Sequence, residues 1–158
     1  MFPLCWQIVY RNGWYYLFFA AGKYCTSSYS EGVARSKGNI FGPYQKLLVP
    51  VLSTGMLGNS HNGQQLVGPG HGTFVTDPAN PAQLVVVFHA SPGDNCNRFS
   101  YAHVVTHAPR LFYLCFLTSV FLLRANVSSY KVVFGSDGWP YIDFQQNASS
   151  ILSWPHGV

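Results

Sequence analysis

The chain repeats one pattern of residues, and this repeat limits its fold more than any other feature does. Residues 7–20 read as a short strand, an Asn12-Gly13 turn and a strongly apolar strand. Residues 73–90 show the same order at an offset of about 66 to 70 residues, although their turn, residues 77–81, is longer. Asn-Gly between β-branched and aromatic residues is a strong signal for a β-hairpin. The sequence therefore predicts two antiparallel β-modules of one kind.

Both modules continue alike after the hairpin. A loop rich in Gly, Ser and Asn leads to a third strand, predicted at residues 32–36 in the first module and 98–104 in the second. A turn with glycine, an aromatic residue and proline closes each module, at residues 42–44 and 138–141. Modules of three or four antiparallel strands at this period, without helical periodicity between them, are typical of β-propeller blades. The alternative interpretation is a Greek-key sandwich that contains two similar hairpins.

The predicted fold class is all-β. Closed propellers have at least about four blades, whereas 158 residues hold two copies of the module and a remnant, so we expect an incomplete propeller. The expected strands are residues 7–10, 14–20, 32–36, 73–76, 84–90, 98–104 and 131–134. A helix across residues 14–20 or 84–90 would contradict the propeller.

The composition excludes several classes of protein. Charged residues are 9% of the chain, against roughly 25% in a typical soluble domain, which excludes a coiled coil, a bundle of long helices and a charged disordered tail. Nine Lys and Arg outnumber five Asp and Glu, but they are scattered singly, so the chain offers no basic patch for nucleic acid. Aromatic residues reach 16%, and uncharged polar residues are frequent. Such a surface suits neutral polar ligands such as sugars.

The cysteines and short sequence motifs give indications of the cellular compartment of the protein. The four cysteines are Cys5, Cys25, Cys96 and Cys115. Their spacing indicates no zinc site, and the three disulfide pairings that four cysteines allow remain open. Asn-X-Ser sequons at Asn126 and Asn147 fit a secreted protein. No signal peptide is visible at the start of the chain, so we expect either a cytosolic protein or a true start upstream.

Several strings of residues follow one another in an order that is specific to one enzyme family. The strings are YRNGWYYLFF at residues 10–19, SYSEGVARS at 28–36, GPY at 42–44, GPGHG at 68–72, VFHA at 87–90 and SDGWP at 136–140. Together they resemble the C-terminal half of glycoside hydrolase family 43, over about residues 7–103 and 131–144. That family contains the five-bladed β-propeller arabinanases, α-L-arabinofuranosidases and β-xylosidases.

The resemblance implies a fold, a substrate and a location. The fold would be the C-terminal portion of a five-bladed propeller, about two blades plus a remnant, with residues 1–158 as one partial domain. The activity would be hydrolysis of O-glycosidic bonds in arabinose- or xylose-containing plant polysaccharides. The protein would be secreted, with plant cell-wall polysaccharide or oligosaccharide as its partner rather than nucleic acid or a membrane.

The resemblance also shows which catalytic groups the chain lacks. Family members use two Asp residues in the first blades and a Glu general acid just before the strand that corresponds to residues 7–10. Residues 1–6 contain no carboxylate, and Glu31 does not match the position of the acid. Inverting glycosidases need two carboxyl groups roughly 6.5–9.5 Å apart. We therefore expect no catalytic residue in this chain and an inactive fragment, with a non-catalytic carbohydrate-binding propeller remnant as the alternative.

Two residues match binding positions of the family. The resemblance implies that His71, in the Gly-Pro-Gly-His string, lies at the centre of the propeller and holds a metal-bound water, often on calcium, near the sugar. It implies that Arg98 reaches sugar hydroxyls. The alternatives are a histidine that satisfies backbone groups at a glycine-crowded strand, and a solvated arginine. No cofactor is expected to be required, and His89 is expected to be a hydrogen-bonded core residue.

The segment 104–130 interrupts the second module. Its apolar part, residues 111–123, is shorter than the roughly 20 residues that span a bilayer, and no propeller blade accommodates it. Joining residue 103 to residue 131 restores the blade pattern. We therefore expect an anomalous insertion, such as a translated intron, together with a start codon placed too late, and we allow a helix only at residues 111–123.

Overall fold

The computed structural model describes residues 6–24, 26–56, 66–77, 80–92 and 129–147. The strands are β1 (Trp6–Arg11), β2 (Trp14–Ala21), β3 (Ser30–Lys37), β4 (Gln45–Lys46), β5 (Leu66–Asp77), β6 (Asn80–Pro92), β7 (Ser129–Phe134) and β8 (Pro140–Asn147). Every regular element in this part of the chain is a strand, so the predicted all-β fold class is confirmed. No helix long and apolar enough to cross a membrane occurs among these residues. Residues 98–104 and most of the segment 104–130 lie outside the described ranges.

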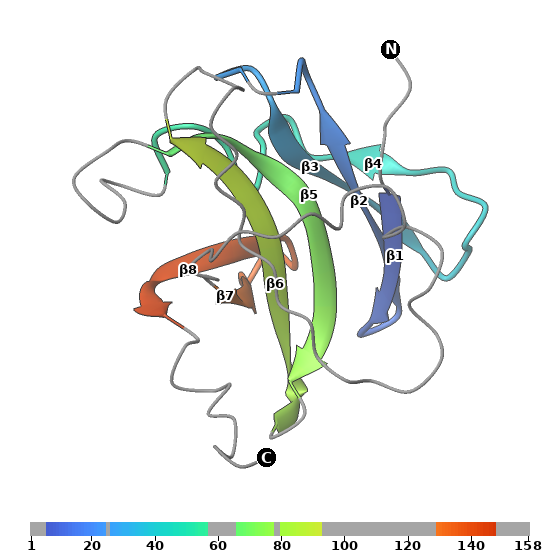
Figure 1. The fold of residues 1–158 in the computed structure, drawn as a ribbon. Coiled ribbons are helices and arrows are strands. Elements are labelled where there is room, and N and C mark those ends of the chain that lie inside the picture. The colour runs from blue at the N-terminus through green and yellow to red at the C-terminus, as the bar shows by residue number, and fades with distance from the viewer. Residues whose placement is uncertain (1–5, 25, 57–65, 78–79, 93–128, 148–158) are drawn as a thin grey trace, which may run out of the picture.

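The strands form two four-stranded antiparallel sheets, in the orders β1-β2-β3-β4 and β5-β6-β7-β8. Figure 1 shows the first sheet in blue to cyan, and the second with β5 and β6 in green and yellow and β7 and β8 in orange and red. Within each sheet, neighbours in space are neighbours in sequence. This meander is the connectivity of one propeller blade, and the expected two blades are present.

The turn between β1 and β2 has the conformation that its sequence predicts. Asn12 has a φ of 52° and Gly13 a φ of 81°. A two-residue type I′ hairpin requires positive φ at both central positions, which Asn and Gly adopt with the least strain. Arg11 and Trp14 pair directly beside the turn, so the register of the first hairpin follows from this dipeptide.

β7 is the third strand of the second sheet. β7 pairs with residues 84–87 of β6 on one side and with β8 on the other. The repeat predicts strands at residues 98–104 and 131–134; β7 confirms the second, whereas residues 98–104 lie outside the described residues. β3 pairs with β2 along residues 14–21, whereas β7 pairs with only the first part of β6. The strand that completes the blade beside residues 84–87 thus follows the apolar segment in sequence.

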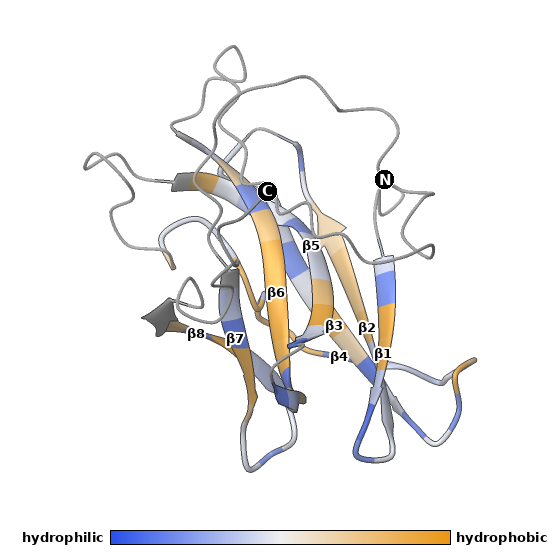
Figure 2. Ribbon diagram, turned by 60° about the horizontal axis from the view of Figure 1, so that its bottom comes forward, coloured by the Kyte–Doolittle hydropathy of each residue, from blue (hydrophilic) through white to orange (hydrophobic). Residues whose placement is uncertain are grey.

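The hydrophobic core lies between the two sheets. Tyr16, Phe18 and Val33 of the first sheet are buried against Phe74 and Val86 of the second. The rings of Phe18 and Phe74 stack with their centroids 3.7 Å apart. Figure 2 shows the middle of β6 coloured as hydrophobic. Because removing apolar surface from water is the main driving force of folding, the two blades form one folding unit.

A side-chain amide joins the first strands of the two blades. Gln7 on β1 donates its Nε2 to the carbonyl oxygen of Phe74 at 2.7 Å, and its Oε1 accepts the backbone N–H of Phe74 at 2.8 Å. The amide therefore satisfies the same pair of backbone groups that a neighbouring strand would satisfy. No backbone pairing between the two sheets occurs among the described residues, so this contact takes its place.

Replacing Gln7 by leucine is expected to lower the free energy of unfolding by about 1–2 kcal/mol, because two partly buried backbone groups of Phe74 lose their partners. Urea unfolding followed by tryptophan fluorescence measures the change. Gln45→Leu is the matched control, since Gln45 is exposed on β4. An equal loss in both variants would show that the bonds to Phe74 contribute nothing specific.

Candidate functional site

β5 contains an irregularity at the Gly-Pro-Gly-His string. His71 and Gly72 lie between the paired positions Gly70 and Thr73, whereas only Phe88 lies between their partners on β6. Two residues against one make a β-bulge. His71 has a φ of 57°, in the left-handed region that few residues other than glycine adopt. Bulges of this kind redirect a side chain and often lie next to active sites.

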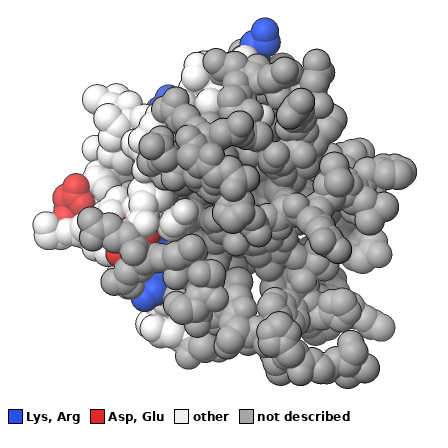
Figure 3. Space-filling view, turned by 60° about the vertical axis from the view of Figure 1, so that its left-hand side comes forward, with Lys and Arg blue, Asp and Glu red and all other residues white. Residues whose placement is uncertain are grey.

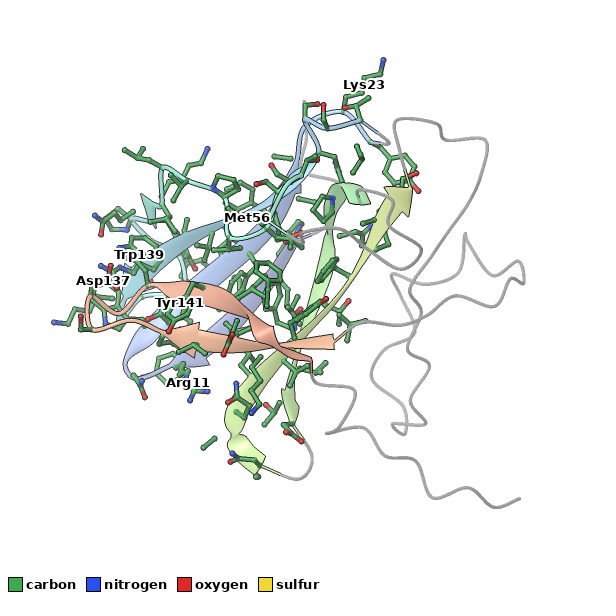
Figure 4. The ribbon with its side chains drawn as sticks, turned by 90° about the vertical axis from the view of Figure 1, so that its left-hand side faces the viewer. Arg11, Lys23, Met56, Asp137, Trp139 and Tyr141 are labelled. Atoms are coloured by element: carbon green, nitrogen blue, oxygen red, sulfur yellow. The ribbon has the colours of Figure 1, made fainter. Side chains whose placement is uncertain are left out.

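Four aromatic side chains gather beside the bulge. They are Tyr24, Tyr29, His71 and His89. The imidazole of His89 lies 5.6 Å from that of His71, 5.5 Å from the ring of Tyr24 and 6.0 Å from the ring of Tyr29, measured between centroids. The two tyrosines come from the loop between β2 and β3, at the end of the molecule where Figure 4 labels Lys23. We call these four residues the ring cluster.

His71 is half-buried, and burial lowers the pKa of its imidazole. Desolvation disfavours the charged form of a histidine, so the imidazole is neutral at pH 7. A neutral imidazole donates one hydrogen bond and accepts another. His71 therefore offers an uncharged ligand both a donor and an acceptor, or one nitrogen for a cation.

Glu31, from the first blade, lies under the bulge. Its side chain is 2% exposed, and its Oε2 accepts the backbone N–H of Gly72 at 3.0 Å. Burial raises the pKa of this carboxyl to about 8, and hydrogen bonds from the backbone of Gly72 and His71 oppose the rise. Glu31 is thus enclosed between the blades and engaged with the backbone that carries His71.

The predicted site residues are only partly described. His71 lies in the ring cluster, whereas Arg98 lies outside the described residues, so their predicted proximity stays a prediction. Asp137 shapes its turn, because its Oδ1 accepts the backbone N–H of Trp139 at 3.0 Å, as in an Asx-turn. Asp77 is buried and is the last residue of β5, six residues after His71.

Sequence reasoning missed two members of the site. His89 was expected in the core, but it is half-buried and contacts His71. Glu31 was set aside because it does not match a catalytic position. The one available signal was a charged residue inside an otherwise apolar and small-residue strand, since a buried carboxylate needs partners.

Calcium does not fit the described residues alone. Calcium takes six to eight oxygen ligands in most protein sites. Within the described ranges no group of three or more His, Cys, Asp or Glu side chains lies together in a way that could hold a metal ion. The nearby carboxyl of Glu31 is bound to backbone amides. Calcium near His71 therefore stays a prediction.

The sequence model of glycosyl hydrolases family 43 matches residues 6–108, which is more than half of the chain. The chain belongs to glycosyl hydrolases family 43. No match was found among curated proteins. In this family-43 chain the matched region includes the first blade, the bulge at His71 and the whole ring cluster.

Solved structures share the fold of this family-43 chain. An endo-1,5-alpha-L-arabinanase from Thermotoga petrophila RKU-1 aligns with a TM-score of 0.57 and 20% identity, over 87% of this chain and 30% of that one. An endo-1,4-beta-xylanase from Bacteroides thetaiotaomicron aligns with a TM-score of 0.54 and 19% identity, over 87% and 36%. The GH43 BlXynB protein from Bacillus licheniformis aligns with a TM-score of 0.53 and 17% identity, over 87% of this chain and 21% of that one. The chain thus spans between 21% and 36% of these relatives, as a part of a propeller does.

Proposed function

We propose that this family-43 chain provides the sugar-binding part of a glycosidase site for arabinose- or xylose-containing plant polysaccharides, and that residues 1–158 alone do not hydrolyse them. The observation that carries the proposal is the neutral, half-buried His71, turned out of the strand by a bulge and placed among aromatic rings. Two of the similar structures are those of an arabinanase and a xylanase, which supports arabinose and xylose as the sugars.

The chemistry of the ring cluster suits a neutral carbohydrate. Sugars present C–H faces that pack on aromatic rings and hydroxyl groups that both donate and accept hydrogen bonds. Tyr24, which is 41% exposed, offers an accessible ring, and His71 offers a donor and an acceptor. Figure 3 shows that most described atoms in that view belong to uncharged residues, with some Lys, Arg, Asp and Glu side chains among them.

The described carboxyl groups support the absence of hydrolysis by this chain alone. Glu31 and Asp77 are 2% and 3% exposed, and Asp137 shapes a turn. Hydrolysis needs one carboxylic acid to protonate the leaving group and one carboxylate to activate water or attack. Each function contributes about 10²–10⁴-fold to the rate, so a chain without either retains binding alone.

Residues 1–158 are expected to show no measurable hydrolysis of aryl arabinosides, aryl xylosides or debranched arabinan. Chromogenic assays measure the rate, with a full-length family-43 arabinanase as the positive control. Turnover that survives substitution of Glu31 and of each Asp would contradict the proposal. Turnover lost only in Glu31→Gln would place the catalytic acid at Glu31 instead.

Binding is expected to persist without hydrolysis. Isothermal titration with arabino- and xylo-oligosaccharides measures it, and His71→Ala should weaken the affinity about tenfold, the effect of losing hydrogen bonds worth about 1.4 kcal/mol. The matched control is Asn39→Ala, in an exposed turn outside the ring cluster. Equal affinity in wild type and His71→Ala would remove His71 from the site.

Titration of calcium into wild type and His71→Ala tests the predicted metal. Expression with a secretion signal, followed by glycan analysis at Asn147, tests the predicted secreted location.

A further inference from the structure

The bulge at His71 leaves backbone groups without partners on β6. The N–H of Gly72 does not take part in the ladder between β5 and β6, because Gly72 lies in the bulge. A buried N–H without a partner costs about 1–3 kcal/mol. The left-handed φ of His71 adds strain that the surroundings must offset. The bulge therefore needs a hydrogen-bond acceptor from outside its own sheet.

Glu31 supplies that acceptor from the neighbouring blade. Its Oε2 lies 3.0 Å from the amide nitrogen of Gly72, and the backbone of His71 donates to the same carboxyl group. A carboxyl that accepts from two successive amides fixes their directions as well as satisfying them. The conformation of residues 71 and 72 thus depends on a side chain from β3.

The backbone of Glu31 is itself held firmly. Its N–H donates to the carbonyl oxygen of Leu52 at 2.8 Å, and its carbonyl oxygen accepts the N–H of Val51 at 2.9 Å. Opposite the carboxyl, Gly72 is packed too closely for a side chain, since a Cβ there would lie 3.1 Å from the ring of Phe74 and 3.2 Å from Val86. Both partners of the contact are therefore fixed in place.

We propose that Glu31 is a positioning residue for His71: its carboxyl group, fixed in the first blade, holds the bulge of the second blade in the conformation that presents the imidazole to the ligand. This inference rests on the sugar-binding role proposed for His71. It makes the conformation of the bulge in the second blade depend on a side chain of the first blade. The carboxyl acts through the backbone and does not touch the sugar.

Two substitutions at Glu31 separate this role from a general effect on stability. Glu31→Asp keeps the acid but is one methylene shorter, so it withdraws the acceptor from Gly72. Glu31→Gln keeps the length and an oxygen acceptor but removes the acid. Asp77→Asn is the matched control, because Asp77 is a second buried carboxyl on β5 at the other end of the strand.

The first measurement is the histidine NMR spectrum of the full 158-residue chain, with the His71 signals assigned by His71→Gln. Glu31→Asp is expected to shift or broaden the signals of His71, Glu31→Gln to leave them near the wild-type positions, and Asp77→Asn to leave them unchanged. Unchanged His71 signals in folded Glu31→Asp would overturn the proposal. Equal shifts in Glu31→Asp and Asp77→Asn would also overturn it, since they would indicate a general change of the blade.

The second measurement is the affinity for arabino- and xylo-oligosaccharides. Glu31→Asp is expected to bind about tenfold more weakly and Glu31→Gln within about threefold of wild type. If the wild type binds no sugar, the proposed function fails, while the NMR comparison still decides whether Glu31 positions His71. If Glu31→Asp does not fold, the NMR signal of the Gly72 amide proton is compared between wild type and Glu31→Gln. The signal is expected to shift, because its hydrogen-bond acceptor changes from a carboxyl to an amide oxygen. An unchanged signal would overturn the proposal.

Discussion

Replacing Arg35 by alanine is expected to lower the free energy of unfolding by about 3 kcal/mol, because its side chain supplies a charged hydrogen bond and a cation–π contact to the second blade, and a further cation–π contact to Trp14 in its own blade. The Cζ of Arg35 lies 4.6 Å from the ring centroid of Trp14 and 3.8 Å from that of Trp139. Its Nη1 donates to the carbonyl oxygen of Asp137 at 2.8 Å. The guanidinium thus joins β3 to the turn between β7 and β8, where Figure 4 labels Asp137 and Trp139.

Two variants test whether the planar guanidinium is responsible. Arg35→Lys keeps the charge but cannot stack between two rings, so it should recover less than half of the loss. Lys37→Ala removes a second cation beside the ring of Trp14, at 5.7 Å and on an exposed residue, and should cost less than about 0.5 kcal/mol. Denaturant unfolding of the whole chain gives all three values. Wild-type stability in Arg35→Lys would assign the effect to charge alone.

The free energy of unfolding is expected to fall as the pH rises through about 8, and Glu31 is the cause. Burial raises the pKa of this carboxyl to about 8 in the folded protein, above its ordinary value of 4.5. The folded state then binds the proton more tightly than the unfolded state, so the stabilisation is fully present below pH 4.5 and is lost as the carboxyl ionises. At about 1.4 kcal/mol per pH unit, the loss between pH 6.5 and 8 is at most about 2 kcal/mol.

Glu31→Gln isolates this effect from that of the neighbouring histidine. His71 faces Glu31 from β5, and its lowered pKa makes acid destabilising below its ordinary value of 6.5. The two groups therefore act in opposite directions in mild acid, and above pH 6.5 the difference between wild type and Glu31→Gln reports the titration of Glu31. The difference in unfolding free energy between wild type and Glu31→Gln should shrink from pH 6.5 to 8.5. A constant difference over that range would show that Glu31 does not titrate there.

Local chemistry is what made the blades predictable. Asn12-Gly13 dictates its own turn, and continuous runs of apolar and aromatic residues mark β2 and β6 without knowledge of their neighbours. The strand at residues 131–134 could be predicted across the segment 104–130 only because joining residue 103 to residue 131 restores the repeated pattern, and β7 lies there beside residues 84–87. Pairing across such a separation leaves no periodic signal in the residues themselves.

The contacts between blades escaped prediction for the same reason. Glu31 meets Gly72 across 41 residues, and Arg35 meets Asp137 across 102. Each contact depends on backbone carbonyl or amide groups that every residue type carries, so the partner leaves no mark in the sequence. His71 was recognisable only because the Gly-Pro-Gly-His string resembles a string of the family, and its neighbour His89 has no comparable role in that resemblance.

The amide of Gln7, which takes the place of a strand between the blades, has a consequence for the angle between the two sheets. Among the described residues no backbone ladder joins the sheets, which are connected by side-chain hydrogen bonds and by the packed core. Each sheet has its own ladder, so we expect substitution of Gln7, Glu31 or Arg35 to change the angle between the sheets while each register is kept. The spacing within the ring cluster, which takes residues from both blades, would change with that angle.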